Sequence, residues 1–134
     1  MDTLDELMTT DPLDVLFWSA TDYAREIAKV LRGLVKIDGD DIIFAQNLNV
    51  ANRIVCYFLA IRAMELMDRR RTFEASPNDI EREAGLIGNS VRPILSKLVE
   101  KGMICKVRDG IYKANTTNLH KTAVFLGAHY GRWQ

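Results

Sequence analysis

The chain has few residues of the kinds that build metal sites and disulfides. Of its 134 residues, two are cysteines and two are histidines. Cys56 falls in an apolar helical stretch and Cys105 on an expected strand, and no paired-cysteine motif surrounds either. A structural zinc site needs four ligands, and disulfides are rare in reducing compartments. We therefore expect two reduced thiols in a cytoplasmic protein that carries no metal or other cofactor.

Long hydrophobic runs are also missing. The longest, residues 54–61, lies between Arg53 and Arg62 and is far shorter than the roughly 20 apolar residues of a membrane-spanning helix. Residues 1–22 contain no lysine or arginine, although a secretory signal begins with a positive region. No nucleophile, base and orienting group occur together at a recognisable spacing. We expect neither a membrane protein nor an enzyme.

Charge is distributed unevenly along a chain whose formal net charge is zero. Residues 1–22 carry six acidic and no basic side chains, and residues 23–85 carry ten of each. Residues 86–134 carry eight basic and two acidic side chains. A basic region confined to one part of a domain is typical of phosphate-binding surfaces, and neutrality of the whole chain does not exclude one.

Residues 76–85 carry the signals of a short helix. Ser76 suits an N-cap, because its hydroxyl can accept from backbone amides of the first turn. Pro77 suits the first helical position, and Gly85 can supply the left-handed residue that ends many helices. Ile80 and Ala84, four residues apart, give this helix one apolar stripe.

A second helix is expected over residues 90–101. Its apolar residues have the spacing of a half-buried helix: Val91, Ile94, Leu95, Leu98 and Val99. Asn89 or Ser90 is expected to cap it, and Pro93 to fall within its first turn, where no amide is needed. The outer face is then polar and mostly basic.

The pattern changes from helix to strand after Gly102. Residues 103–108 alternate in polarity, and residues 111–113 resume the alternation after Asp109-Gly110, a dipeptide suited to tight hairpin turns. Two short helices followed by a two-stranded hairpin are the element order of a winged helix-turn-helix. Residues 79–113 resemble prokaryotic winged-helix transcriptional regulators. The recognition helix of those regulators, running into the wing, corresponds here to residues 90–95, Leu98 and residues 101–104. With a preceding helix the resemblance covers about residues 49–115.

The resemblance implies duplex DNA as the partner, with the second helix in the major groove. Arg92, near the start of that helix, is expected to contact bases or backbone. The wing cations Lys106, Arg108 and Lys113 are expected to meet phosphate or the minor groove. The full expected DNA-binding set is Asn89, Ser90, Arg92, Ser96, Lys97, Lys101, Lys106, Arg108 and Lys113.

The rest of the chain is expected to be helical, with one more hairpin. Apolar residues recur at helical spacing over residues 12–33, and residues 34–38 and 42–46 flank a turn at Gly39. Asn49 is expected to cap a helix that Arg69, Arg70 and Arg71 close. This helix is apolar nearly all round, so more than one side of it must be covered. The expected fold class is mainly α with small β-hairpins.

Two parts of the chain are expected. Residues 1–48 form an acidic segment, helix and hairpin for packing or dimerisation, and residues 49–134 form the winged-helix domain with a C-terminal helix. The favoured interpretation is a homodimeric, sequence-specific transcriptional regulator, because apolar helices outside the motif suit a two-fold contact. The alternative is a winged helix that serves as a protein-interaction module in a larger assembly. A third hypothesis is that the acidic N-terminal segment folds over the basic region and inhibits binding. The sequence leaves open the operator, activation or repression, and any small-molecule effector.

Overall fold

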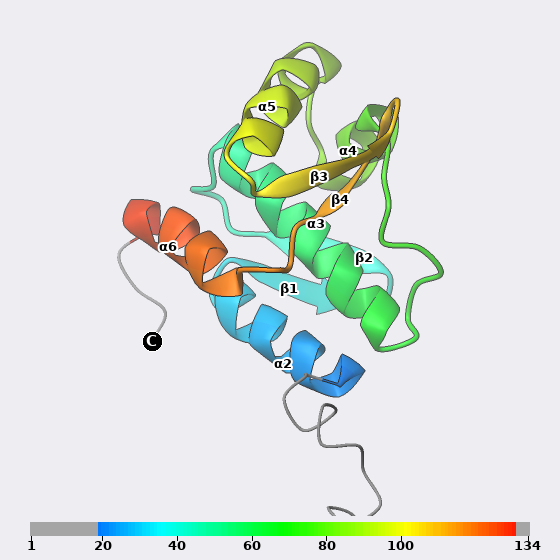
Figure 1. Ribbon diagram of the computed structural model, residues 1–134, viewed down its shortest axis with the longest axis vertical. Coiled ribbons are helices and arrows are strands. Elements are labelled where there is room, and N and C mark those ends of the chain that lie inside the picture. The colour runs from blue at the N-terminus through cyan, green and yellow to red at the C-terminus, as the bar shows by residue number, and fades with distance from the viewer. Residues whose placement is uncertain (1–18, 131–134) are drawn as a thin grey trace, which may run out of the picture.

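The computed structural model describes residues 19–130, which form five helices and two antiparallel hairpins (Figure 1). In chain order they are α2 (Ala20–Leu31), β1 (Val35–Asp38), β2 (Asp41–Phe44), α3 (Val50–Leu66), α4 (Pro77–Ala84), α5 (Gly88–Glu100), β3 (Ile104–Arg108), β4 (Ile111–Ala114) and α6 (Leu119–Tyr130). The expected combination of helices with small hairpins is present in the described residues.

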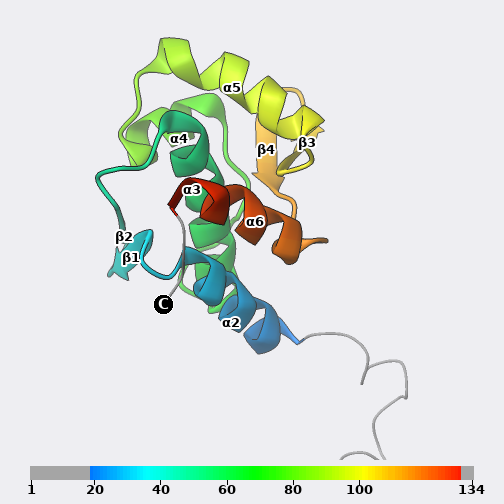
Figure 2. The ribbon, with the colours of Figure 1, turned by 90° about the vertical axis from the view of Figure 1, so that its left-hand side faces the viewer.

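α3 lies at the centre of the core. Every residue from 54 to 61 is at most 2% exposed. α2, α4, α5, β4 and the β1–β2 hairpin all pack against this helix. Figure 2 shows α5 at the top of the molecule and α2 at the bottom, with α3 between them. The expectation that this helix is covered on more than one side is confirmed.

A single buried cluster contains residues from both halves of the chain. Ile27 of α2, Leu95 of α5 and Leu126 of α6 are each 0% exposed and belong to the same cluster as α3. α2 and α6 also contact each other directly. The N-terminal helix and hairpin therefore support the same core as the basic part of the chain.

α2 begins later than expected. Ser19 caps it by accepting from the amide of Asp22 at 3.2 Å, and the Asp22 carboxylate accepts from the Ser19 amide at 3.0 Å. Ser19 itself has an extended backbone. The expectation of one continuous helix over residues 12–33 is therefore wrong at Ser19. Residues 12–18 lie outside the described part of the chain.

α3 ends earlier than expected. Its last helical residue is Leu66, and Asp68 then adopts a positive φ of 58°, which is incompatible with a continuing helix. Arg69, Arg70 and Arg71 follow the helix instead of closing it, so the expectation that they end it is wrong. Arg70 is instead an ion-pair partner of Glu83 in α4, at 3.0 Å.

α4 has the ends that its sequence predicts. Ser76 accepts from the amide of Asp79, and the Asp79 carboxylate accepts from the Ser76 amide. Pro77 is the first helical residue, and Gly85 has the left-handed conformation with φ 67°. The predicted start and end of this helix are confirmed. They could be predicted because the capping partners Ser76 and Asp79 are only three residues apart and the final turn needs only the glycine itself.

α5 begins differently from the expectation. Its N-cap is Ile87, which makes no side-chain cap bond, and Asn89 and Ser90 lie inside the first turn. Pro93 is therefore inside the helix and not in the first turn. Because proline has no amide hydrogen, the carbonyl of Asn89 lacks its usual partner four residues on. The expected cap and the expected place of Pro93 are both wrong.

Both hairpins have the expected turns. Gly39 connects β1 to β2 with φ 63°, and Gly110 connects β3 to β4 with φ 76°. One pairing was not expected. Ala75, just before α4, exchanges two backbone hydrogen bonds of 2.9 Å with Tyr112 of β4. The segment that leads into α4 is thus joined to the β3–β4 hairpin.

Candidate nucleic-acid interface

α5 buries one face and exposes the other. Val91, Leu95 and Leu98 are at most 2% exposed. With about 3.6 residues per turn, the line directly opposite contains four exposed residues that we call the crest: Asn89, Pro93, Ser96 and Glu100. The expected site residues Asn89 and Ser96 therefore point outward. Pro93 and Glu100 were not in the expected set, although the helical spacing of Val91, Leu95 and Leu98 already places them opposite the buried face.

Exposed cations flank the crest on both sides. Arg92 lies on one side, and Lys97 and Lys101 lie on the other. Neither Arg92 nor Lys97 forms an ion pair with any residue between 19 and 130. The Lys101 Nζ atom lies 5.7 Å from the centroid of the Phe125 ring of α6. These positive charges are available to a partner.

Ser90 has a different role from its neighbours. Its side chain is half-buried, and its Oγ atom donates to the carbonyl of Ile87 at 2.9 Å. The hydroxyl thus completes the first turn of α5. A contact from Ser90 to a partner requires this hydroxyl to rotate away from Ile87.

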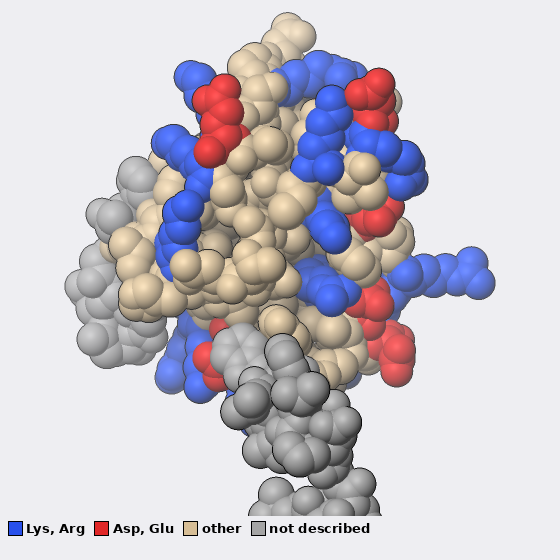
Figure 3. Space-filling model, in the orientation of Figure 1, with Lys and Arg blue, Asp and Glu red and all other residues tan. Residues whose placement is uncertain are grey.

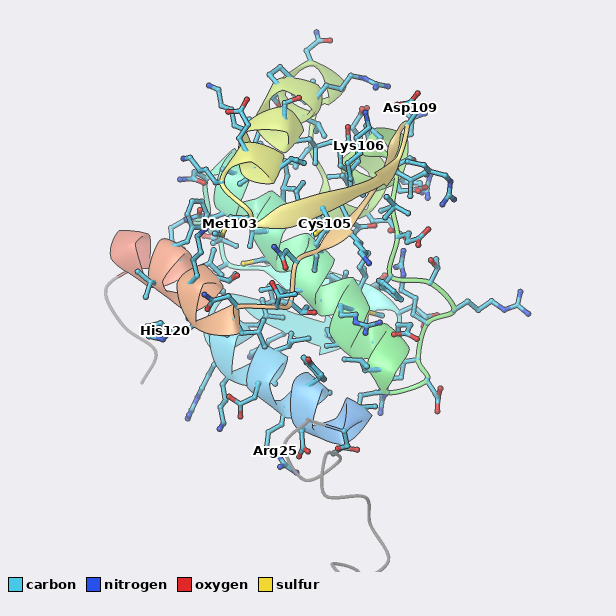
Figure 4. The ribbon with its side chains drawn as sticks, viewed as in Figure 1. Arg25, Met103, Cys105, Lys106, Asp109 and His120 are labelled. Carbon is cyan, nitrogen blue, oxygen red and sulfur yellow. The ribbon has the colours of Figure 1, made fainter. Side chains whose placement is uncertain are left out.

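Two of the three expected hairpin cations are already paired. Lys106 Nζ lies 3.0 Å from Asp109 Oδ1, and Figure 4 shows both side chains near the tip of the hairpin. Arg108 lies 3.3 Å from Glu74, in the segment before α4. The hydrogen bond to Asp109 raises the pKa of the Lys106 ammonium, which therefore stays charged. Exposed ion pairs of this kind are weak enough for a phosphate to replace the carboxylate.

Lys113, the third hairpin cation, is half-buried and has no ion pair within the described range. A further cation, Lys121 of α6, was missed in the sequence. Its Nζ atom lies 3.3 Å from the position that a Cβ would take on Gly102, directly after Lys101. Nothing in sequence spacing connects Lys121 to α5, because only tertiary packing brings α6 beside the end of that helix.

The basic region also contains acidic side chains. Residues 86–130 carry seven basic and two acidic side chains. Figure 3 shows lysine and arginine concentrated over the half of the molecule that contains α5 and the β3–β4 hairpin, with acidic side chains between them. Glu100 on the crest and Asp109 at the hairpin tip both lie within this region. The surface attracts anions on average and is not uniformly positive.

α4 is held to α3 by a polar cluster beneath this surface. The Tyr57 hydroxyl donates to Glu83, and Arg70 donates to the same carboxylate. Burial raises the pKa of Glu83, but the hydrogen bonds from Arg70 and Tyr57 outweigh it and leave the pKa below its ordinary value. Glu83 is therefore ionised at neutral pH and links two helices.

Other kinds of site find little support in the described residues. Between residues 19 and 130, no group of three histidine, cysteine, aspartate or glutamate side chains could hold a metal ion. Cys56 and Cys105 are free, and burial raises the pKa of the Cys56 thiol to about 12. Within the same range, no helix is long and apolar enough to cross a membrane.

Comparisons of the chain with protein-family models, curated proteins and solved structures give no significant match. No relative therefore supplies a function or a set of site residues. The exposed face of α5 and the hairpin beside it are the features from which a function can be inferred.

Proposed function

We propose that α3, α4, α5 and the β3–β4 hairpin form a winged helix-turn-helix that binds duplex DNA. α5 is its recognition helix and the hairpin is its wing. The protein acts as a sequence-specific transcriptional regulator in the cytoplasm. One observation carries this proposal: Arg92 and Lys97 are exposed on opposite sides of the α5 crest, and neither is paired with an acidic residue of the described chain.

The frame behind α5 supports the proposal because it fixes the helix relative to the hairpin. Asn115 Nδ2, after β4, donates to the carbonyl of Gly102 at 2.8 Å. The amide of Met103 donates to the carbonyl of Leu98 at 2.9 Å. These bonds connect the end of α5 to both ends of the hairpin. A rigid frame is what lets a helix and a wing meet two grooves at the same time.

The positions of the side chains suggest separate roles. Asn89 and Ser96 on the crest, with Arg92 beside them, are placed to meet base edges. Lys97, Lys101 and Lys121 lie on the other flank and suit the phosphate backbone, which fixes position but not sequence. The wing cations contact phosphate after they exchange their acidic partners: Lys106 and Arg108.

A homodimer is part of the proposal. One recognition helix reads few base pairs, and a two-fold arrangement doubles its contacts. Val124 on α6 is 56% exposed and offers an apolar contact to a second copy. The recognition helices of the two copies are then expected about one DNA turn apart.

Titration of a labelled random duplex, followed by fluorescence anisotropy at several salt concentrations, tests the proposal. The wild type should bind, and its affinity should fall steeply with salt. Lys97→Ala should reduce the slope of log affinity against log salt by about 1, if its side chain neutralises one phosphate, whereas Arg92→Ala should mainly relax the preference for one base pair in a selected site. Lys36→Ala, at an exposed cation on β1, is the matched control and should leave the slope unchanged. Weak, salt-independent binding would contradict the proposal.

A second function is favoured by a specific feature of α5. Ile87, at its start, is 80% exposed, and the crest includes Pro93 and the carboxylate of Glu100. An exposed apolar side chain and a carboxylate on the same helix suit a protein partner better than they suit phosphate. The second candidate is therefore a winged helix that docks on another protein. It predicts no salt-dependent affinity for duplex DNA in the titration above.

A further inference from the structure

An apolar groove of about 380 Å³ lies between α2, the C-terminal end of α3 and β1. Small side chains of α2 and α3 form part of its wall, including Ala24, Ala28 and Ala63. Ile37 and Met67 line it as well and are 38% and 52% exposed. Large apolar side chains left in contact with water favour an occupant that covers them.

The rim of the groove is basic. Arg25 of α2 and Arg69, after α3, are the ionisable residues that line it. Arg25 lies 3.5 Å from Asp22, and Figure 4 shows Arg25 on the side of α2 that faces away from the core. Arg69 has no ion pair within the described part of the chain. The occupant that this groove fits is therefore apolar and acidic.

We propose that residues 11–18 of the same chain occupy the groove. This segment contains four large apolar side chains, Leu13, Leu16, Phe17 and Trp18, and two acidic ones, Asp11 and Asp14. The apolar side chains match the walls and the carboxylates match the basic rim. Residues 2–8 also combine apolar and acidic side chains, but they are further along the chain from Ser19 and contain no aromatic side chain; residues 131–134 contain no acidic side chain.

The connection to the groove is short. The described chain begins at Ser19, and Thr21 already lines the groove. Ser19 has φ −73° and ψ 172°, an extended backbone that begins α2 at the next residue. Because an extended chain spans roughly 3.4 Å per residue, residues 11–18 are long enough to reach the groove from Ser19.

A second groove, of about 540 Å³, lies between α2 and the start of α6. It fits the segment less well, because its lysine, Lys29, is paired with Glu26 at 2.8 Å, and Asn118 and His120 make the lining more polar. It also begins further from Ser19. The proposed site lies on α2 and α3 and not on α5, so it differs from the hypothesis that the acidic segment covers the DNA-binding surface.

The fluorescence of Trp18 tests the proposal in the full-length chain. Trp18 and Trp133 are its two tryptophans, so Trp133→Phe leaves Trp18 as the only reporter. Trp18 should emit at a shorter wavelength in the native protein than in denaturant, and acrylamide should quench it weakly. Met67→Asp introduces a charge into the groove, and it should shift the emission to longer wavelength and increase the quenching.

Ile43→Asp is the matched control. Ile43 of β2 is 52% exposed, as Met67 is, but it does not line the groove. This variant should leave the emission of Trp18 unchanged, and circular dichroism verifies that both variants are folded. Arg69→Glu should act in the same direction as Met67→Asp, because it reverses the charge that faces the acidic segment.

Three results would overturn the proposal. The first is native Trp18 emission that equals the emission in denaturant. The second is an equal response to Met67→Asp and Ile43→Asp. The third is a Trp18 signal that is lost on dilution in step with a dimer measured by sedimentation, because a second copy then supplies the segment.

Discussion

Arg53 of α3 donates from its Nε atom to the backbone carbonyl of Ala84, the last residue of α4. The last carbonyls of a helix have no partner within the helix, so this side chain satisfies one of them. The guanidinium carbon of Arg53 also lies 4.4 Å from the centroid of the Phe44 ring in β2. One side chain thus joins three elements and fixes the turn that leads from α4 to α5.

Replacing Arg53 by methionine should destabilise the protein. Arg53→Met keeps an apolar stem but removes the hydrogen bond to Ala84 and the cation over Phe44. The expected loss in the free energy of unfolding is about 1–3 kcal/mol, measured by urea unfolding. The exposed Arg92 provides the matched control, since Arg92→Met should change stability by no more than about 0.5 kcal/mol. Equal effects of the two variants would mean that Arg53 has no special structural role.

The stability of the fold should fall in acid, in part through Glu83. The hydrogen bonds from Arg70 and Tyr57 keep the pKa of this carboxyl below its ordinary value near 4.5, against the effect of its burial. A carboxyl whose pKa is lower in the folded state contributes stability above the unfolded-state pKa, and this is lost as pH falls through the folded-state pKa. The wild-type free energy of unfolding should therefore decrease as pH is lowered from about 4.5.

Glu83→Gln should flatten this acid dependence, measured as urea unfolding at a series of pH values. The flattening should be partial, because the hydrogen bond from the Ser76 amide also lowers the pKa of Asp79. Glu81→Gln, on the same helix and without an ion pair in the described part of the chain, is the control. A profile for Glu83→Gln that is parallel to the wild type would contradict the role assigned to this carboxyl.

Features of the fold that depend on near neighbours could be predicted from the sequence. The reciprocal cap of Ser76 with Asp79 spans three residues, and the glycine turns of both hairpins are equally local. The start of α5 could not be predicted in this way, because Ile87 has no capping side chain. The burial of Val91 and Leu95 sets where this helix begins. A helix-forming pattern predicts that a helix exists better than where it begins.

Pairings between distant segments could not be predicted from the sequence either. Arg108 and Glu74 are 34 positions apart, and Tyr57 and Glu83 are 26 apart. No periodicity within a helix or strand connects such residues. The cations of the expected site could therefore be named from the sequence, but not the carboxylates that pair with two of them, nor Lys121 beside the end of α5.

Pro93 should cost stability where it lies. A proline inside a helix removes one hydrogen bond and crowds the carbonyl four residues earlier, here that of Asn89, at a cost of about 3 kcal/mol. Part of this is offset, since proline restricts the unfolded chain by about 0.4–1 kcal/mol. Pro93→Ala should therefore raise the free energy of unfolding by about 2–2.6 kcal/mol.

Urea unfolding measures the effect of Pro93→Ala, and Ser96→Ala on the same crest is the control. Ser96→Ala should gain no more than about 0.5 kcal/mol, from helix propensity alone. If Pro93→Ala is no more stable than Ser96→Ala, Pro93 is accommodated at its position without cost. A gain in stability together with weaker DNA binding would show that the proline shapes the crest for its partner.

The acidic partners of the hairpin cations should limit DNA affinity if the proposed function holds. Asp109→Asn releases Lys106 and retains a residue suited to the hairpin turn, and Glu74→Gln releases Arg108. Each variant should bind duplex DNA more tightly than the wild type at low salt. Where the released cation gains a phosphate, the slope of log affinity against log salt should steepen by about 1.

The control for these variants must remove the same charge without releasing a wing cation. Asp38→Asn does so, because Asp38 is exposed on β1 and has no ion pair in the described range. If all three variants change affinity equally, only net charge matters and the hairpin does not touch DNA. If Asp109→Asn and Glu74→Gln exceed the control, the wing lies against the phosphate backbone. At moderate salt, interactions over more than about 10 Å are largely screened, so a purely long-range effect would be similarly small in all three variants.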